Sequence, residues 1–192
     1  MVDAVMRKSR LSPSALDILG ATIGPGSFTG IRIGLAAVRG IALATGAHTV
    51  GVTGFQAVAA GLASQAHERG AGFLLVALES LREDLYIQLF DHAYRPLVDP
   101  MAAMPAALNE SLSGLIGTAP LVVAGDAAQR AVDMLLHRAS TIVIERSAPD
   151  AAGVLRAVLR LAPTGESRVK PLPLYLRPPD VTVSRSRQGA GQ

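Results

Sequence analysis

The strongest candidate for binding chemistry is the segment at residues 24–30, which reads GPGSFTG. Three glycines in seven residues permit positive φ angles and exclude the interior of a helix or strand. Because a helix is predicted to follow directly, its free N–H groups could bind an anion or a nucleotide phosphate, with a hydroxyl group capping the helix. The residues that would form this site are Gly24, Gly26, Ser27, Thr29 and Gly30.

The same pattern is equally typical of a tight strand-to-helix turn that binds nothing. It is not a P-loop, because no lysine follows the glycines, and its third glycine lies one position too late for a G-x-G-x-x-G motif. Ser27 is not placed as a nucleophile, because Pro25 and Thr29 occupy the positions where a nucleophile elbow needs glycine. We therefore predict no catalytic residue in this segment.

The other polar residues offer little further chemistry. The four histidines are scattered and the chain has no cysteine, so we predict no metal site and no thiol catalysis. Glu79, Glu83 and Asp84 cluster with Arg82 around a predicted hairpin, where they could act as paired acids or simply be solvated turn residues. Asp126 follows a predicted strand, and we expect it to cap the next helix.

The elements that position these residues follow from hydrophobic periodicity and from the glycines and prolines. Strands are predicted at residues 16–23, 48–52, 72–79, 85–91, 121–125 and 141–145. Helices are predicted at residues 29–45, 55–69, 106–116, 127–139 and 151–161, after a helix end within residues 1–10. Residues 96–105 are predicted to be loop, and residues 174–176 could pair at a sheet edge. The alternation of strands and helices after residue 121 predicts a parallel crossover and an α/β fold.

The helix predicted at residues 29–45 is apolar on nearly every face, which indicates burial on nearly every face. Arg32 and Arg39 lie seven residues apart and therefore share one face of this helix. They could pair with acidic groups of a partner helix, or their stems could lie along the fold with the guanidinium groups in water. The longest apolar stretch, residues 31–47, is shorter than the roughly 20 residues of a membrane span, so we predict no membrane segment.

The chain has 192 residues, of which 49% are hydrophobic and 17% charged, which predicts one large or two small folded domains. The start of the chain does not resemble a signal peptide, so a cytoplasmic location is predicted. Residues 151–192 hold seven Lys or Arg and two Asp or Glu, so the net charge of +3 belongs to the C-terminal segment. We expect residues 178–192 to be a basic, flexible tail, and one alternative function is tRNA binding through this tail.

Residues 23–46, IGPGSFTGIRIGLAAVRGIALATG, closely resemble the signature of the TsaB (YeaZ) family, the glycoprotease-like proteins of bacterial tRNA threonylcarbamoyladenosine biosynthesis. Further segments resemble later landmarks of that family: LDILGATIGPG, VALESLREDLYIQLFD, VVAGDAA, SAPDAAGVLR and PLPLYLRPPD. The resemblance implies an α/β, actin-like ATPase (ribonuclease H-like) fold with two lobes, at residues 1–70 and 71–177. The family's opening strand, with its Asp-Thr-Ser phosphate turn, has no counterpart. The first lobe is therefore expected to lack its opening strands.

The same resemblance implies a non-catalytic subunit that binds and activates the TsaD transferase subunit, which modifies ANN-decoding tRNAs. A TsaE-type ATPase would be a further partner, tRNA would be bound only indirectly, and two copies of this chain could also pair. The family's dimer surface places the partner contacts on Ile31, Arg32, Leu35, Val38, Arg39 and Ala42. No resident cofactor is implied, although a nucleotide could lie at the partner interface. The alternative left open is a glycoprotease-like or ATP-hydrolysing enzyme.

Overall fold

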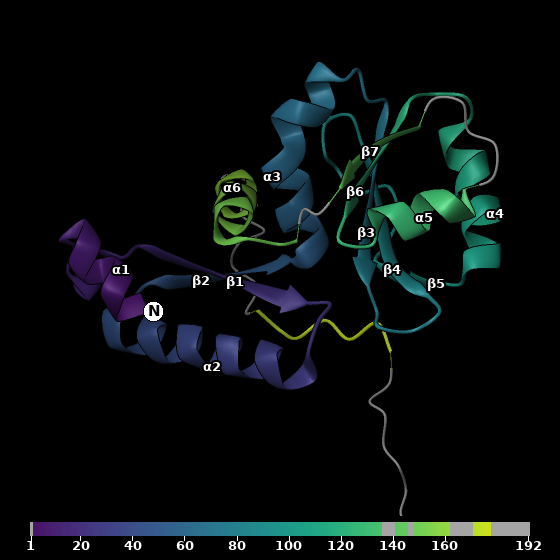
Figure 1. Ribbon diagram of the computed structural model, residues 1–192. Helices are drawn as coiled ribbons and strands as arrows, with labels where there is room; N and C mark the ends of the chain where they lie inside the picture. The colour runs from purple at the N-terminus through teal and green to yellow at the C-terminus, as the bar shows by residue number, and fades with distance from the viewer. Residues whose placement is uncertain (1, 136–140, 146–147, 162–170, 178–192) are drawn as a thin grey trace, which may run out of the picture.

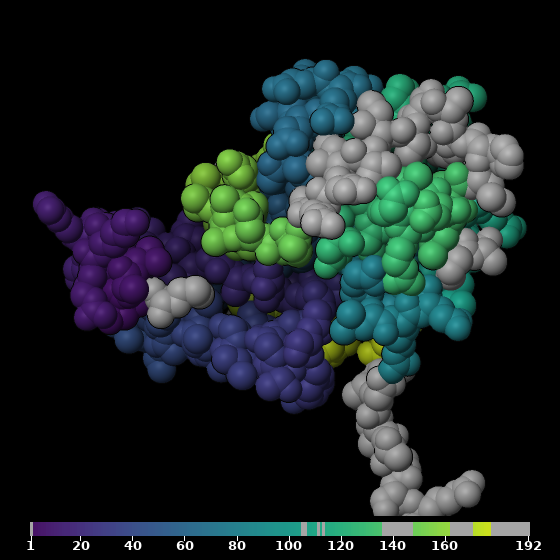
Figure 2. All heavy atoms as spheres, in the orientation of Figure 1, coloured from purple at the N-terminus to yellow at the C-terminus, as the bar shows by residue number. Residues whose placement is uncertain are grey.

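The computed structural model describes residues 2–135, 141–145, 148–161 and 171–177. It contains two β-sheets that lie beside each other, and helices cover both faces of each sheet (Figure 1). In the space-filling view the N-terminal helices form an arm on the left, and the second sheet belongs to the larger body on the right (Figure 2). The predicted α/β class is confirmed.

The first sheet has two parallel strands, β1 (Ile18–Gly24) and β2 (His48–Thr53), in a register that pairs Ile18 with His48. Helix α2 (Phe28–Thr45) makes the crossover between them and packs its inner face on Ala21. Helix α6 (Ala151–Leu161) covers the opposite face, where Val158 lies against Gly20. Helix α1 (Val2–Ser9) and a 3₁₀ turn at Pro13–Ala15 precede β1.

The second sheet has five strands in the order β5-β4-β3-β6-β7. They are β3 (Phe73–Glu79), β4 (Leu85–Asp91), β5 (Met101–Ala103), β6 (Leu121–Gly125) and β7 (Thr141–Glu145). The predicted β3–β4 hairpin is antiparallel, and β3, β6 and β7 are parallel, as the predicted crossover requires. Helices α4 (Pro105–Ile116) and α5 (Ala128–Met134) cover one face, and α3 (Gly54–Glu68) covers the other.

Three local predictions differ from the structure. Residues 101–103, predicted as loop, form an edge strand on β4. The helix predicted at residues 127–139 begins at Ala128 and ends at Met134, and residues 136–140 lie outside the described residues. Residues 174–176 form no strand, although the N–H of Leu174 donates to the carbonyl oxygen of Ile23 at 2.7 Å. The tail predicted at residues 178–192 also lies outside the described residues.

Helix α3 is buried between the two sheets. Its Phe55 packs on the second sheet, whereas its Ala57 faces α6 and β2. Helix α6 can approach this closely because of Gly153, where a Cβ atom would lie 2.4 Å from the carbonyl oxygen of Ala57. Since α6 comes late in the chain but packs on the first sheet, the division into lobes at residue 70 stays a prediction.

A groove of about 690 Å³ runs along β1, between α2 and α6. Within the described residues β1 pairs with β2 alone, so its other edge carries no strand. The groove walls are apolar, and on α6 the side chains of Leu155 and Leu159 are 58% and 61% exposed. An unpaired strand edge between apolar walls is a template for another chain.

We predict that the chain self-associates through this open edge of β1. Thr22→Lys places a charge on the face of β1 that lines the groove, so it should lower the mass measured by light scattering after size exclusion. Leu81→Lys, at an exposed position in the loop between β3 and β4 that does not line the groove, is the control for a general gain of charge. A monomeric wild-type chain, or equal effects of the two variants, would contradict the assignment to β1.

Asp91, at the end of β4, holds the loop that follows. Its buried carboxylate accepts hydrogen bonds from the N–H groups of Ala93 at 2.8 Å and Arg95 at 2.9 Å, and from Nε of Arg95 at 2.9 Å. Burial raises the pKa of Asp91, but the hydrogen bonds and the charge of Arg95 lower it by more. The net pKa therefore lies below its ordinary value.

This lowered pKa predicts that Asp91 stabilises the fold above the ordinary carboxyl pKa of 3.8, and that the contribution is lost as the pH falls below that value. Asp91→Asn should lower the melting temperature near neutral pH, and its difference from wild type should shrink as the pH falls below 3.8. Asp3→Asn, at an exposed ion pair on α1, is the control. A difference for Asp91→Asn that stays constant with pH would refute this role.

Candidate partner-binding helix and its attachments

The glycine segment turns the chain from the end of β1 into α2. Ser27 caps the helix as predicted, because its Oγ accepts a hydrogen bond from the N–H of Gly30 at 3.3 Å. Gly24 has a φ of +128°, and a Cβ atom there would lie 2.6 Å from the carbonyl oxygen of Leu174. The close approach of residues 171–177 therefore requires glycine at position 24, whether or not a ligand binds.

The structure brings the predicted anion-site residues together on this turn, with Gly26, Thr29 and Gly30 exposed. A pocket of about 200 Å³ lies beside the turn, and Arg82 and Arg177 help to line it. Arg177 already pairs with an acidic side chain of the second sheet. Because packing and capping account for Gly24 and Ser27, anion or nucleotide binding here stays a prediction.

The inner face of α2 belongs to the core of this chain. Ile31 and Leu35 are buried against Ala21, while Val38 and Ala42 are partly buried. The resemblance implies partner contacts for all four, and this stays a prediction. In this structure Ile31 and Leu35 are buried within the chain itself. They hold α2 against β1.

Arg32 and Arg39 contact the chain's own C-terminal segment. Nε of Arg32 donates to the hydroxyl oxygen of Tyr175 at 3.0 Å, and its guanidinium group lies 3.8 Å from the ring centre of Phe28. Nη2 of Arg39 donates to the carbonyl oxygen of Pro171 at 2.6 Å. The sequence predicts either partner contacts or solvated guanidinium groups for these two residues, and it contains no signal for this intramolecular arrangement.

The outward face of α2 is apolar and exposed. Ile33 is 65% and Leu43 is 90% exposed, and they share this face with four small residues, Ala36, Ala37, Gly40 and Ala44. The spacing of three, four and seven residues places Ile33 and the four small residues opposite Ile31 and Leu35, and Leu43 lies at the edge of this face. Contiguous exposed apolar surface of this kind marks an interaction site. Because α2 is apolar on nearly every side, the sequence carried no signal that distinguished the two faces.

By length and composition alone, α2 could also cross a membrane, which is weak evidence for a span. The buried inner face and the two arginine contacts show that α2 packs within the folded domain. The sequence predicts no membrane segment. Helix α2 nevertheless passes the test of length and composition, although it packs on β1 in this structure.

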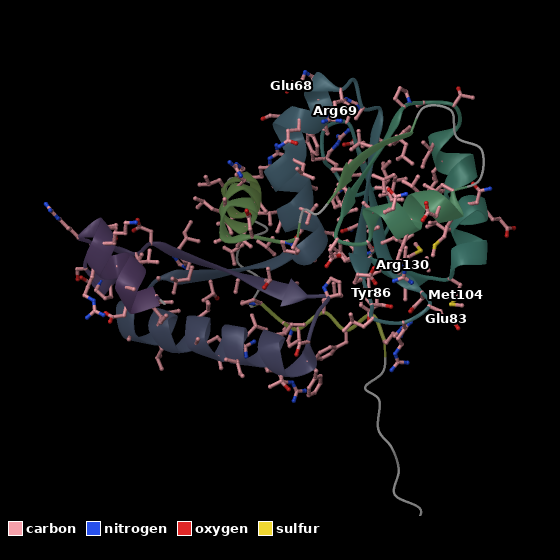
Figure 3. All side chains as sticks on the ribbon, in the orientation of Figure 1. Glu68, Arg69, Glu83, Tyr86, Met104 and Arg130 are labelled. Atoms are coloured by element: carbon pink, nitrogen blue, oxygen red, sulfur yellow. The ribbon has the colours of Figure 1, made fainter. Side chains whose placement is uncertain are left out.

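Arg130 of α5 contacts the β3–β4 hairpin through one carboxylate and two main-chain carbonyl groups. Its guanidinium group pairs with the carboxylate of Glu79 and donates to the carbonyl oxygens of Arg82 at 2.9 Å and Glu83 at 3.1 Å. Figure 3 labels Arg130 and Glu83 at this end of the second sheet. The predicted cap by Asp126 is wrong, because its carboxylate accepts from the N–H of Glu79 at 2.9 Å. These contacts favour the structural alternative over paired acid chemistry.

Asp84 is a buried carboxylate, only 3% exposed, at the start of β4. The hydroxyl of Ser80 lies 2.8 Å from its Oδ1, and Arg177 pairs with its Oδ2. Arg177 comes from the far end of the described chain. A buried charge of this kind depends on its partner, since removing one member leaves the other uncompensated. Among the residues that the structure describes, no three His, Asp or Glu side chains are grouped to hold a metal ion.

A model of the family described as TsaD: tRNA N6-adenosine threonylcarbamoyltransferase matches residues 1–109, which is more than half of the chain. The chain belongs to this family. No curated protein sequence matches the chain.

Two solved structures share the fold of this family member. One, a protein with similarity to peptidase YEAZ from Pseudomonas aeruginosa, has a TM-score of 0.76 and 22% identity. The other, YeaZ from Pseudomonas aeruginosa, has a TM-score of 0.74 and 21% identity. Each alignment covers 92% of this chain and 81% of the other. The resemblance to the TsaB (YeaZ) family is thereby confirmed at the level of the fold, which is the actin-like ATPase (ribonuclease H-like) fold.

We predict that Arg177→Ala lowers the free energy of unfolding by about 3 kcal/mol, because it leaves Asp84 buried without its counter-charge. The double variant Arg177→Ala/Asp84→Ala should lose less than the sum of the two single losses. Urea denaturation measures all three values. A loss for Arg177→Ala of about 0.5 kcal/mol, typical of an exposed pair, would disprove the dependence.

Proposed function

We propose that this protein is a TsaB-type, non-catalytic subunit that binds and activates a TsaD-type transferase in the synthesis of threonylcarbamoyladenosine in tRNA. The observation that carries the proposal is the exposed apolar face of α2, on a chain that belongs to the family and has the YeaZ fold. Recruitment of a TsaE-type ATPase, indirect contact with tRNA and a cytoplasmic location belong to the same proposal.

The outward face of α2 suits a partner helix. Its small residues, such as Ala36 and Gly40, allow a second helix backbone to approach closely, while Ile33 and Leu43 offer side chains that a partner could bury. The inner face is fixed on β1 by Ile31 and Leu35, so the helix does not have to refold in order to present this surface. Interfaces of this kind concentrate their binding energy in a few central side chains.

Three of the candidate polar groups in the sequence already serve the fold, which supports a scaffold role over catalysis. Ser27 caps α2, Glu79 pairs with Arg130, and Asp84 pairs with Arg177. The enzyme alternative makes a direct counter-prediction. Hydrolysis of ATP or of peptides by the purified chain alone, abolished by a substitution within it, would overturn the non-catalytic role.

We predict that Leu43→Glu weakens binding to a TsaD-type subunit by about 30-fold or more, the loss typical of an interface hot spot. Leu81→Glu is the matched control, because Leu81 is 91% exposed and belongs to the loop between β3 and β4, not to the outward face of α2. Titration calorimetry or biolayer interferometry with the purified subunit gives both affinities. Equal binding by the Leu43→Glu and Leu81→Glu variants would exclude the outward face of α2 as the interface.

A further inference from the structure

We infer that residues 171–177 form a latch that fastens α2 and β1 to the second sheet, and that Arg32 and Arg39 serve this latch and are not contacts for a partner. Figure 1 shows this segment, in yellow, passing between α2 and β1 toward the β3–β4 hairpin. It is also visible between the N-terminal arm and the larger body in Figure 2. The latch does not depend on the proposed partner.

The first part of the latch lies on α2. Pro171 is buried, with its ring 2.9 Å from where a Cβ atom of Gly51 would lie, and its carbonyl oxygen accepts the hydrogen bond from Arg39. Four residues later, Tyr175 accepts a hydrogen bond from Arg32 and stacks on Phe28, with ring centres 5.3 Å apart. Arg32 and Arg39, two turns apart on one helix face, therefore hold two points of the same extended segment.

The second part joins β1 to the second sheet. The N–H of Leu174 donates to Ile23 at the end of β1, and Leu176 packs in the cluster formed by α3 and the second sheet. Arg177 then pairs with Asp84, and its guanidinium group lies 5.8 Å from the ring centre of Tyr86. Within seven residues the chain contacts α2, β1 and β4.

This arrangement changes what the two arginines can do for a partner. Their guanidinium groups are engaged within the chain, at the border of the apolar outward face. Replacing both by glutamate would release the latch. Any weakening of partner binding in that variant would then be an indirect result of this release. The partner surface is then the apolar face alone, and the arginines act as positioning residues for the chain's own C-terminal segment.

Amide hydrogen exchange at Leu174 tests the latch without any partner, because this N–H reports directly on contact with Ile23. We expect exchange to accelerate about tenfold or more in Arg32→Ala/Arg39→Ala, and by less in Tyr175→Phe, which keeps the ring but removes the acceptor hydroxyl. Arg7→Ala, which removes an exposed arginine on α1, is the matched control and should exchange as wild type does.

An unchanged Leu174 amide in the double alanine variant would refute the latch. A second result would also refute it: the Arg32→Glu/Arg39→Glu variant no longer binds a TsaD-type subunit, while its Leu174 amide keeps its wild-type protection. In that case the arginines would contact the partner directly. Acceleration in both double variants, with wild-type exchange in Leu43→Glu, supports the latch. Failure of the wild-type chain to bind that subunit would defeat the proposed function and leave the exchange result standing.

Discussion

Both sheets of this protein pack against the same helix, α3, and the contact that allows this is the close approach of α6 at Gly153. A helix between two sheets must be apolar on two sides, and α3 meets this demand with small residues toward α6 and larger ones toward the second sheet. A side chain at position 153 would push α6 away from Ala57. Since α6 also covers β1, the distance between these helices decides where the first sheet lies.

Much of the fold could be predicted from the sequence, because the main elements are long and strongly patterned. The alternation of residues 85–91 and the buried run at 121–125 each correspond to one strand. The missed strand β5 has three residues, too few for any period to show. The cap expected from Asp126 is wrong because of a tertiary contact. Its carboxylate accepts a hydrogen bond from the N–H of Glu79, which is distant in sequence and close in space.

The candidate site was predicted less completely than the fold. A helix as apolar as α2 can be buried on either side. Packing against Ala21 and Ile23 of β1 makes the side that carries Ile31 and Leu35 the inner face. The glycine segment raises a similar ambiguity, because a phosphate and a neighbouring carbonyl group both need a backbone without a side chain. In this structure the carbonyl oxygen of Leu174 occupies that space beside Gly24. The local sequence predicts neither which face of α2 is buried nor which group approaches Gly24.

The place of α6 and of residues 171–177 in the chain has a consequence for synthesis on the ribosome. Strand β2 ends at Thr53, whereas α6 ends at Leu161, about 100 residues later. At typical elongation rates of about 5–20 residues per second, β1, β2 and α2 wait roughly 5–20 s for the helix that covers them. During that interval the face of β1 that α6 later covers and the outward face of α2 are both open to other nascent chains. The first sheet is thus completed by residues that leave the ribosome about 100 positions after its second strand.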